Sequence, residues 1–481
     1  MRRLRRPPAR VPLGTPLAVL ARAAGLALGL AGGLAGGLGG IPAAVRAQPV
    51  AAAPAPARCA PPADTLRTPG LRAPVTLLRD SAGIVHIRAS NERDLFFAQG
   101  WNAARDRLFQ LELWRRQATG TLAEALGPRF VSRDRAARLL AYRGDMAREL
   151  AHYHPRGAAI VQAFVDGVNA YVARTERDPS LLPPEFALLG LKPGRWTPAV
   201  VVSRHNALTG NAESEIDRAR AVRLLGAERV KALGVYEPGD VRLDVDAALD
   251  VAALQDSALA VYREWRSVPS LAPRGRGAAP DAGDGDGGAS DRDMPEGGAS
   301  RVGGVRRDGI APPPDGSNNW AVAGARTASG KPLLANDPHR TIALPSLRYW
   351  VHLTAPGWDV VGGGEPALPG VAIGHNAHGA WGLTIFGLDQ TDLYVYELDP
   401  ADPTRYRWQG GWARMTEVRD TIRVKDGAPV AVTLRYTRHG PVTWVDAGRH
   451  RAYALRAAWL EPGGAPYLAS LRLDQARTWA E

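Results

Sequence analysis

Apolar positions recur at helical spacing along much of the first half of the chain. A long helix is predicted from about Glu92 to Ala118, where the positions that fall on one face are Leu95, Ala98, Trp101, Leu108, Leu111 and Trp114. A second helix is predicted over 158–174, with Val161, Phe164, Val168 and Tyr171 on one face. Ahead of both, β-branched residues at 75–78 and 83–87 predict two strands around a turn. The first half is therefore expected to be largely helical.

The periodic pattern stops between about Arg266 and Gly316. Pro, Gly, Ala and Asp dominate this stretch. Such a composition cannot bury enough apolar surface to offset the entropy lost on ordering. We expect a disordered, protease-accessible spacer over 266–316 that separates a helical region, 75–265, from the region 317–481.

Alternation of apolar and polar residues takes over beyond Ser317. A strand over Asn318–Val322, a turn around Gly330 and a returning strand over Pro332–Ala335 predict a hairpin with Ser317 at its first position. Further strands are predicted over 348–353, 359–361, 371–373, 382–385, 393–397, 421–424, 429–436, 442–445 and 453–458. The second half is expected to form a many-stranded, largely antiparallel sheet, which makes the fold class α+β.

The N-terminus has the pattern of a targeting segment. Residues 1–10 are rich in arginine, an Ala/Leu/Gly run covers Leu13–Ile41, and small residues at Ala44–Ala47 suit a cleavage site. We interpret 1–47 as a signal peptide and 48–74 as a Pro/Ala-rich connector, and expect an exported protein, periplasmic or secreted. The alternative, a stable membrane anchor, is disfavoured because the run is rich in glycine and weakly hydrophobic. The pair Arg2-Arg3 leaves twin-arginine export open.

Charge and cysteine content narrow the classes of function. The net charge of +12 comes from arginine, since lysine occurs only at Lys192, Lys231, Lys331 and Lys425. The arginines are scattered and form no basic stripe with interleaved aromatic residues, so nucleic-acid binding is not expected. A single cysteine, Cys59, excludes an intramolecular disulfide and a multi-cysteine metal site.

The dipeptide Gly316-Ser317, at the end of the spacer, is the candidate reactive point. A serine hydroxyl needs an adjacent base, and a cut directly before the serine would supply one, because the new α-amine has a pKa of about 8. An ordinary Gly-Ser turn is the alternative for such a dipeptide taken alone. Likewise the carboxylates Glu213, Glu215 and Asp217 are, taken alone, typical of a solvated helix face.

Several motifs, in order, resemble the precursors of the penicillin acylase (penicillin amidase) family of N-terminal-nucleophile hydrolases. In the first half they are Arg79-Asp80, Gly83–Ile87, Ala104–Gln110, Arg115-Arg116 with Gly120 and Glu124, and Ser214–Asp217. In the second half they are Gly316–Trp320, Leu334–His339, Gly374–Asn376, Trp381–Thr384, Asp389 with Asp392–Tyr394, and His439–Pro441. The resemblance implies an αββα sandwich, incomplete here, built from a largely helical α chain and a strand-rich β chain.

The resemblance also assigns the chemistry. Ser317 would cut the chain after Gly316, so that an α and a β chain form a heterodimer, and would then attack small-molecule amides through an acyl-enzyme. One oxyanion donor would be the backbone N–H of Ile385, with its neighbour Phe386 as the alternative if the alignment slips by one. His339 would orient the hydrogen bonds of the nucleophile.

The same matching turns a set of oxygens into a metal site. Glu215, Asp389, the carbonyl of Thr391 and Asp392 correspond to ligands of one structural calcium ion in the family, and calcium prefers such hard oxygen ligands. The ion would join the α chain to the β chain. Two further ligands would lie beyond the end of this chain.

That end is where the sequence departs from the family. Thr478–Glu481 has the Thr-x-x-Glu form of a capping box, so a helix is expected to begin where the chain stops. The resemblance implies a longer β chain that supplies an asparagine as second oxyanion donor, much of the acyl pocket and the other calcium ligands. We expect these 481 residues alone to be poorly stable and catalytically weak or inactive.

The acyl group is left open. The resemblance implies that members of the family with an aromatic acyl group carry aromatic residues where this chain has Arg340 and Ile373, so a phenylacetyl pocket is less expected here. An aliphatic acyl chain, as in acyl-homoserine lactones or lipopeptides, or an acidic acyl group paired to Arg340 is expected instead. An Arg340 side chain that faces solvent is the alternative to that pairing.

Two other classes of function remain. One is a non-catalytic exported binding or scaffold protein. The other is a Ser-His-Asp hydrolase, which would lack the Gly-x-Ser-x-Gly elbow and would leave the spacer unexplained.

Overall fold

The computed structural model describes residues 64–203, 211–234, 242–246, 249–267, 269, 271, 317–338, 344–384 and 389–481. The predicted signal peptide, most of the connector and nearly all of the spacer lie outside these residues. So do five residues named as candidates from the sequence: Gly316, His339, Arg340, Ile385 and Phe386. The helices and strands belong to one compact unit, which begins at Leu66 and runs to Glu481.

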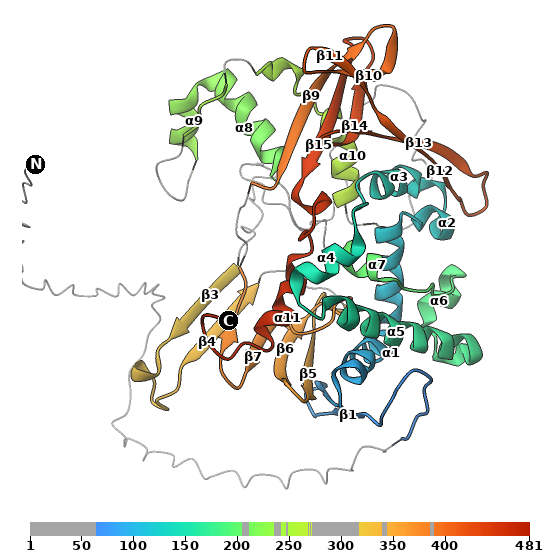
Figure 1. Cartoon of the computed structure of the whole chain (residues 1–481), viewed down its shortest axis with the longest axis vertical. Coiled ribbons are helices and arrows are strands. Elements are labelled where there is room, and N and C mark those ends of the chain that lie inside the picture. The colour runs from blue at the N-terminus through green and yellow to red at the C-terminus, as the bar shows by residue number, and fades with distance from the viewer. Residues whose placement is uncertain are drawn as a thin grey trace, which may run out of the picture. The chain divides into compact units, whose positions relative to one another are not determined.

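Helices account for most of the described first half (Figure 1). They are α1 (Glu92–Thr119), α2 (Leu122–Leu126), α3 (Val131–Leu139), α4 (Met146–Tyr153), α5 (Gly157–Arg177), α6 (Pro184–Leu189), α7 (Pro198–Ser203), α8 (Ala212–Leu225), α9 (Ala227–Leu233) and α10 (Ser257–Arg266), with α11 (Ser470–Leu473) near the C-terminus. The two predicted helices are confirmed as α1 and α5. Among the described residues, no helix has both the length and the apolar character needed to cross a bilayer.

The described strands form three sheets (Figure 1). The six-stranded sheet has the order β1-β2-β5-β6-β7-β8, with β1 (Thr76–Arg79), β2 (Val85–Arg88), β5 (Tyr349–Ala355), β6 (Trp358–Gly364), β7 (Ile373–Asn376) and β8 (Ala380–Trp381). The seven-stranded sheet has the order β11-β10-β9-β15-β14-β13-β12, with β9 (Thr391–Asp399), β10 (Asp402–Trp408), β11 (Gly411–Arg414), β12 (Thr416–Ile422), β13 (Val430–Thr437), β14 (Gly440–Asp446) and β15 (Arg451–Ala457). The third sheet is the hairpin of β3 (Ser317–Val322) and β4 (Leu333–Pro338).

Most predicted strands are confirmed with small shifts of their ends. One is wrong over its described residues, because 382–384 of the strand expected over 382–385 form no strand and the short β8 ends before them, at Trp381. Beyond that point the backbone of Leu383 bonds to a side chain, that of Asn336, rather than to a neighbouring strand. The strands β10 and β11 were not predicted.

The two halves of the chain interlock in the six-stranded sheet. Strand β2 pairs with β5 in parallel, with Val85 opposite Val351, whereas the other pairings among the described strands are antiparallel. On α1, the buried amide of Gln99 donates to the carbonyl of Gly370 and accepts from its N–H, each at 2.9 Å. A single apolar core collects side chains from α1, α5, β2, β5 and β6. Folding of the first half therefore depends on the second.

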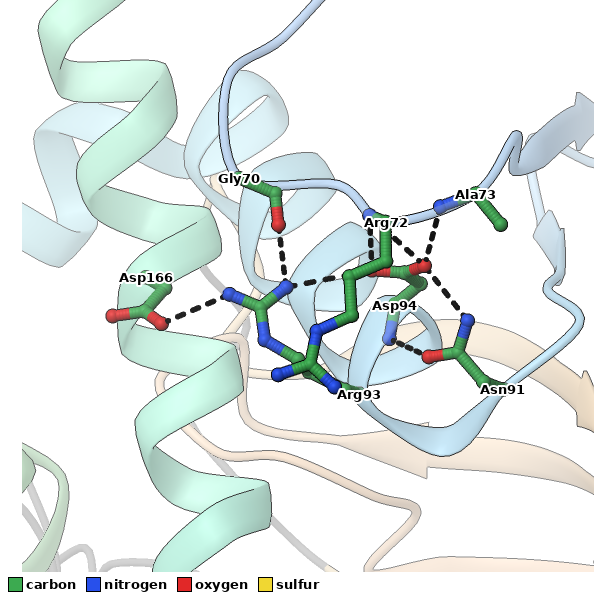
Figure 2. Close-up of polar contacts among 7 residues, drawn as sticks. All are labelled: Gly70, Arg72, Ala73, Asn91, Arg93, Asp94 and Asp166. Carbon is green, nitrogen blue, oxygen red and sulfur yellow. Dashed lines mark hydrogen bonds and ion pairs between the residues drawn. The ribbon is translucent and has the colours of Figure 1, made fainter.

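The end of the predicted connector packs on the start of α1 (Figure 2). Asn91 caps the helix by accepting from the N–H of Asp94, and the Asp94 carboxylate accepts in return from the Asn91 amide and from the backbone N–H of Arg72 and Ala73. Burial alone would raise the pKa of Asp94, but these hydrogen bonds and the charge of Arg93 outweigh it and hold the pKa below its ordinary value. The carboxylate thus fastens the chain that leads into β1.

Candidate active site

The hairpin β3–β4 carries Ser317 at the first residue of β3, as the sequence predicts. Its register pairs Ser317 with Pro338 and Val322 with Leu333. Pro338 directly precedes His339, which itself lies outside the described residues. The register therefore sets the chain just before His339 opposite the proposed nucleophile, and Ser317 is half-buried there.

A second segment reaches this hairpin through the side chain of Asn336. The Nδ2 of Asn336 donates to the carbonyl of Asn318 at 3.1 Å and to that of Leu383 at 3.0 Å. The N–H of Leu383 donates back to Asn336 Oδ1 at 3.2 Å. Asn336 belongs to the motif that also contains His339, but the sequence interpretation gave it no role of its own. The structure adds it to the site.

Glycine at position 382 permits this close approach. A Cβ at Gly382 would lie 2.9 Å from the Nδ2 of Asn319 and 2.9 Å from the Cβ of Asn336, nearer than side chains tolerate. The segment 382–384 therefore packs on the hairpin. It ends directly before Ile385. Of the two candidate pocket residues, Arg340 lies outside the described residues and Ile373 lies half-buried in β7.

Three of the four predicted calcium ligands, those from Glu215, Asp389 and Thr391, meet where α8 begins and β9 starts. Glu215 lies in the first turn of α8, and Asp389, Thr391 and Asp392 lie at or just before the start of β9. Burial raises the pKa of Glu215, and the negative charges of Asp389 and Asp392 act in the same direction, against a hydrogen bond from Asn211. The carboxylates are thus close enough to repel one another.

Asn211 is the residue in this cluster that sequence reasoning missed. Its Nδ2 donates to the Glu215 carboxylate, to Asp389 Oδ1 at 2.8 Å and to the Thr391 carbonyl at 3.3 Å. Its Oδ1 accepts from the N–H of Gln390 at 2.9 Å and from the N–H of Thr391 at 2.8 Å. Asn211 stands at the N-cap position of α8, but its side chain makes no capping hydrogen bond there. The preference of asparagine for N-caps therefore could not indicate its bonds to β9.

Several of the predicted calcium ligands gather around one side-chain amide. Three oxygens, from Glu215, Asp389 and Thr391, converge on one nitrogen of Asn211. Calcium binds oxygens of this kind drawn from distant segments. In the described part of the chain, no three His, Cys, Asp or Glu side chains gather closely enough to hold a metal ion by themselves. Backbone and further oxygens would therefore have to complete the coordination.

Two histidine–carboxylate pairs lie in the six-stranded sheet, outside the sites predicted from the sequence. His86 contacts Asp80 at 3.2 Å, His352 contacts Asp359 at 2.8 Å, and the Nδ1 atoms of the two rings face each other at 2.9 Å. These rings hydrogen-bond to one another across the β2–β5 pairing. They extend the contact between the two halves of the chain.

Known proteins resemble this chain over most of its length. The sequence model of the penicillin amidase family matches residues 74–481. A penicillin acylase 2 proenzyme of Pseudomonas sp. (strain SE83) is 32% identical over 87% of this chain and 50% of its own length. Penicillin G acylase of Escherichia coli is 29% identical over 85% of this chain and 50% of its own.

A third relative is named for a different substrate. An acyl-homoserine lactone acylase of Pseudomonas aeruginosa is 31% identical over 78% of this chain and 40% of its own length. The chain thus spans about half the length, or less, of the curated relatives it matches.

Proposed function

Because the chain belongs to the penicillin amidase family, we propose that the protein is an acylase, which hydrolyses the amide bond between an acyl group and the amine of a small molecule. The position of Ser317 at the first residue of a strand, with a second segment held beside it by Asn336, is the observation that carries this proposal. The names of the matched relatives, which are all acylases, also favour catalysis.

In the proposed reaction Ser317 acts twice. Its hydroxyl oxygen first attacks the carbonyl of Gly316, so that an ester bond forms as the peptide C–N bond breaks and the α-amine of Ser317 is freed. Water then hydrolyses the ester, which releases the Gly316 carboxylate and cuts the chain.

The freed α-amine, through a water molecule, then takes the hydroxyl proton while the oxygen attacks the substrate carbonyl. The substrate C–N bond breaks as the proton passes to the leaving amine, and water hydrolyses the acyl-enzyme to release the acid and restore the hydroxyl. The N–H of Ile385 would stabilise the oxyanion, and His339 would orient the nucleophile. Phe386 is the alternative donor.

The cut products would remain together as an α chain and a β chain. The parallel pairing of β2 with β5 and the shared core of α1, α5 and β5 support this, because both cross the proposed cleavage site. The packing of both sides against each other would form the αββα sandwich of the family. Export of the precursor to the periplasm or medium belongs to the same proposal, and cell fractionation tests it.

The substrate class that we propose rests in part on the names of the relatives. Two are named as penicillin acylases and one as an acyl-homoserine lactone acylase. We propose an N-acylated small molecule of this kind, including lipopeptides, with an aliphatic or acidic acyl group because Arg340 and Ile373 replace aromatic residues.

A panel of N-acyl amides tests this function in the natural full-length protein. Release of the free amine is expected from substrates with aliphatic or acidic acyl groups. Their kcat/KM should exceed that of the phenylacetyl analogue by at least about tenfold, which corresponds to a difference of only about 1.4 kcal/mol in transition-state binding. Release from none of the substrates by a correctly cut protein would contradict the proposal. A phenylacetyl preference would contradict only the substrate class.

Calcium would be held by Glu215, Asp389, the Thr391 carbonyl and Asp392, and would join α8 to β9. It would supply structural stability and no step of the reaction. Removing it with EGTA is expected to lower the melting temperature, since an ion present at 100 times its Kd stabilises by about 2.7 kcal/mol. Added Ca²⁺ should restore stability, and Mg²⁺, with its stricter geometry, should not.

Matched variants sharpen the calcium test. Asp389→Asn should abolish the response to EGTA. Asp217→Asn, an exposed acid on the same helix that pairs with Arg220, should leave it intact. Equal melting temperatures in EGTA and in millimolar Ca²⁺ would contradict the metal site without bearing on Ser317.

A further inference from the structure

The side-chain amide of Asn336 acts like a peptide group inserted between two segments. It accepts from the N–H of Leu383 and donates to the carbonyl of the same residue, as a strand residue does with its partner. The same nitrogen donates to the carbonyl of Asn318. One side chain therefore binds the residue after Ser317 and a residue two positions before Ile385.

These segments otherwise belong to different sheets. Asn318 lies in the hairpin β3–β4, whereas Leu383 follows β8 of the six-stranded sheet. Gly382, which has no side chain, packs directly against Asn319 and Asn336. The spacing between the hairpin and residues Gly382–Thr384 thus depends on the length and the hydrogen bonds of the Asn336 side chain.

We propose that Asn336 is a positioning residue, which sets the distance between the Ser317 nucleophile and the backbone that leads into the oxyanion donor. The inference rests on the proposed function of the same site. Oxyanion donors act on charge that develops only in the transition state, and they must already be in place. A displacement of about 1 Å can cost on the order of 10² in rate. Loss of Asn336 should therefore reduce kcat and leave KM nearly unchanged.

The test is Asn336→Asp in the natural full-length protein, assayed for amide hydrolysis. Aspartate keeps the shape and the oxygen that accepts from Leu383, but it loses both N–H donors and places a negative charge beside two carbonyl oxygens. The expected result is a fall in kcat of about 10- to 100-fold with KM within threefold.

Asn376→Asp is the matched control. The amide of Asn376 also bridges backbone groups, by donating to the carbonyls of Leu473, Asp474 and Ala476 and accepting from the N–H of Gly379. It should lower the melting temperature with kcat within twofold of the parent. Gly382→Ala is a second variant, which forces the same two segments apart from the other side. It should reproduce the loss of kcat even if Asn336→Asp does not fold.

Ser317→Ala assayed in parallel separates the two hypotheses. If Ser317→Ala is inactive but folded Asn336→Asp and Gly382→Ala keep kcat within twofold of the parent, positioning by Asn336 is overturned and the proposed function stands. The same holds if kcat falls equally in Asn376→Asp. If Ser317→Ala remains active, the proposed function fails, and the inference that rests on it fails as well.

Discussion

Ser317→Ala should leave the chain uncut between Gly316 and Ser317 and should reduce amide hydrolysis by a factor of about 10³ or more, the scale on which serine hydrolases lose rate with their nucleophile. The reason is that one hydroxyl performs both reactions in the proposed mechanism. An alanine at the same strand position keeps the backbone pairing with Pro338. The hairpin should therefore fold as before, and only the chemistry should be lost.

The measurement is the intact mass of the purified protein, together with amine release. The parent should yield a chain that begins at Ser317, and the variant a single uncut chain. Ser329→Ala is a fair control because it lies in the turn of the same hairpin, where it accepts a hydrogen bond from Lys331. It should be cut and active. A Ser317→Ala protein cut at 316/317 would mean that a separate protease does the processing.

Ser317→Cys distinguishes loss of the nucleophile from loss of the fold. A thiol can take over both attacks, so cutting is expected at a reduced rate. If Ser317→Cys and Ser317→Ala were equally cut and equally active, position 317 would have no role in the chemistry.

Local patterns made much of this structure predictable. The apolar periodicity gave α1 nearly residue for residue. It could not show that the helix is buried on all sides from Asp94 to Ala104 and on one face only beyond that. The hairpin at Ser317 was equally clear, since alternation and a Gly330 turn specify a register. The Thr-x-x-Glu pattern is reflected in part at the end of the chain, where Thr478 accepts from the N–H of Glu481 and the Glu481 carboxylate accepts from the N–H of Arg477.

Side chains that bond to remote backbone leave no such pattern. Asn336 binds Leu383, which lies 47 positions further along the chain, and Asn211 binds Gln390, which lies 179 positions further along. Nothing local in the sequence marks either partner. The parallel pairing of β2 with β5 has the same origin, since it joins strands on opposite sides of the spacer. Such long-range contacts also decide which of the three sheets each strand of the second half joins. The alternation of apolar and polar residues along one strand does not predict that.

The crossing of α1 and α5 carries the second large expected effect. The helices lie side by side (Figure 1), and each presents a glycine to the backbone of the other. A Cβ at Gly100 would lie 2.9 Å from the carbonyl carbon of Phe164 and closer still to its oxygen. A Cβ at Gly167 would meet Phe97 in the same way, at 2.8 Å from its carbonyl carbon. Backbone cannot rotate aside as a flexible side chain can.

Gly100→Ala sets two physical effects against each other. Helix propensity favours alanine over glycine by about 1 kcal/mol, so an isolated helix would be stabilised. Overpacking costs about 1–3 kcal/mol and occasionally more. Here the added methyl group would clash with main chain, so the two helices would have to move apart, and both contribute side chains to the same apolar core. We expect packing to win and Gly100→Ala to lower the free energy of unfolding by about 3 kcal/mol.

Urea unfolding of the purified variants measures this difference. Gly379→Ala is the control, since no atom lies within 4 Å of a Cβ added there, and it should stay within about 0.5 kcal/mol of the parent. The double variant Gly100→Ala/Gly167→Ala should cost less than the sum of the two single changes, because one separation of α1 from α5 relieves both clashes. Full additivity would mean that the two glycines act independently. A Gly100→Ala protein as stable as the parent would show that helix propensity, not the close crossing, decides the stability of this core.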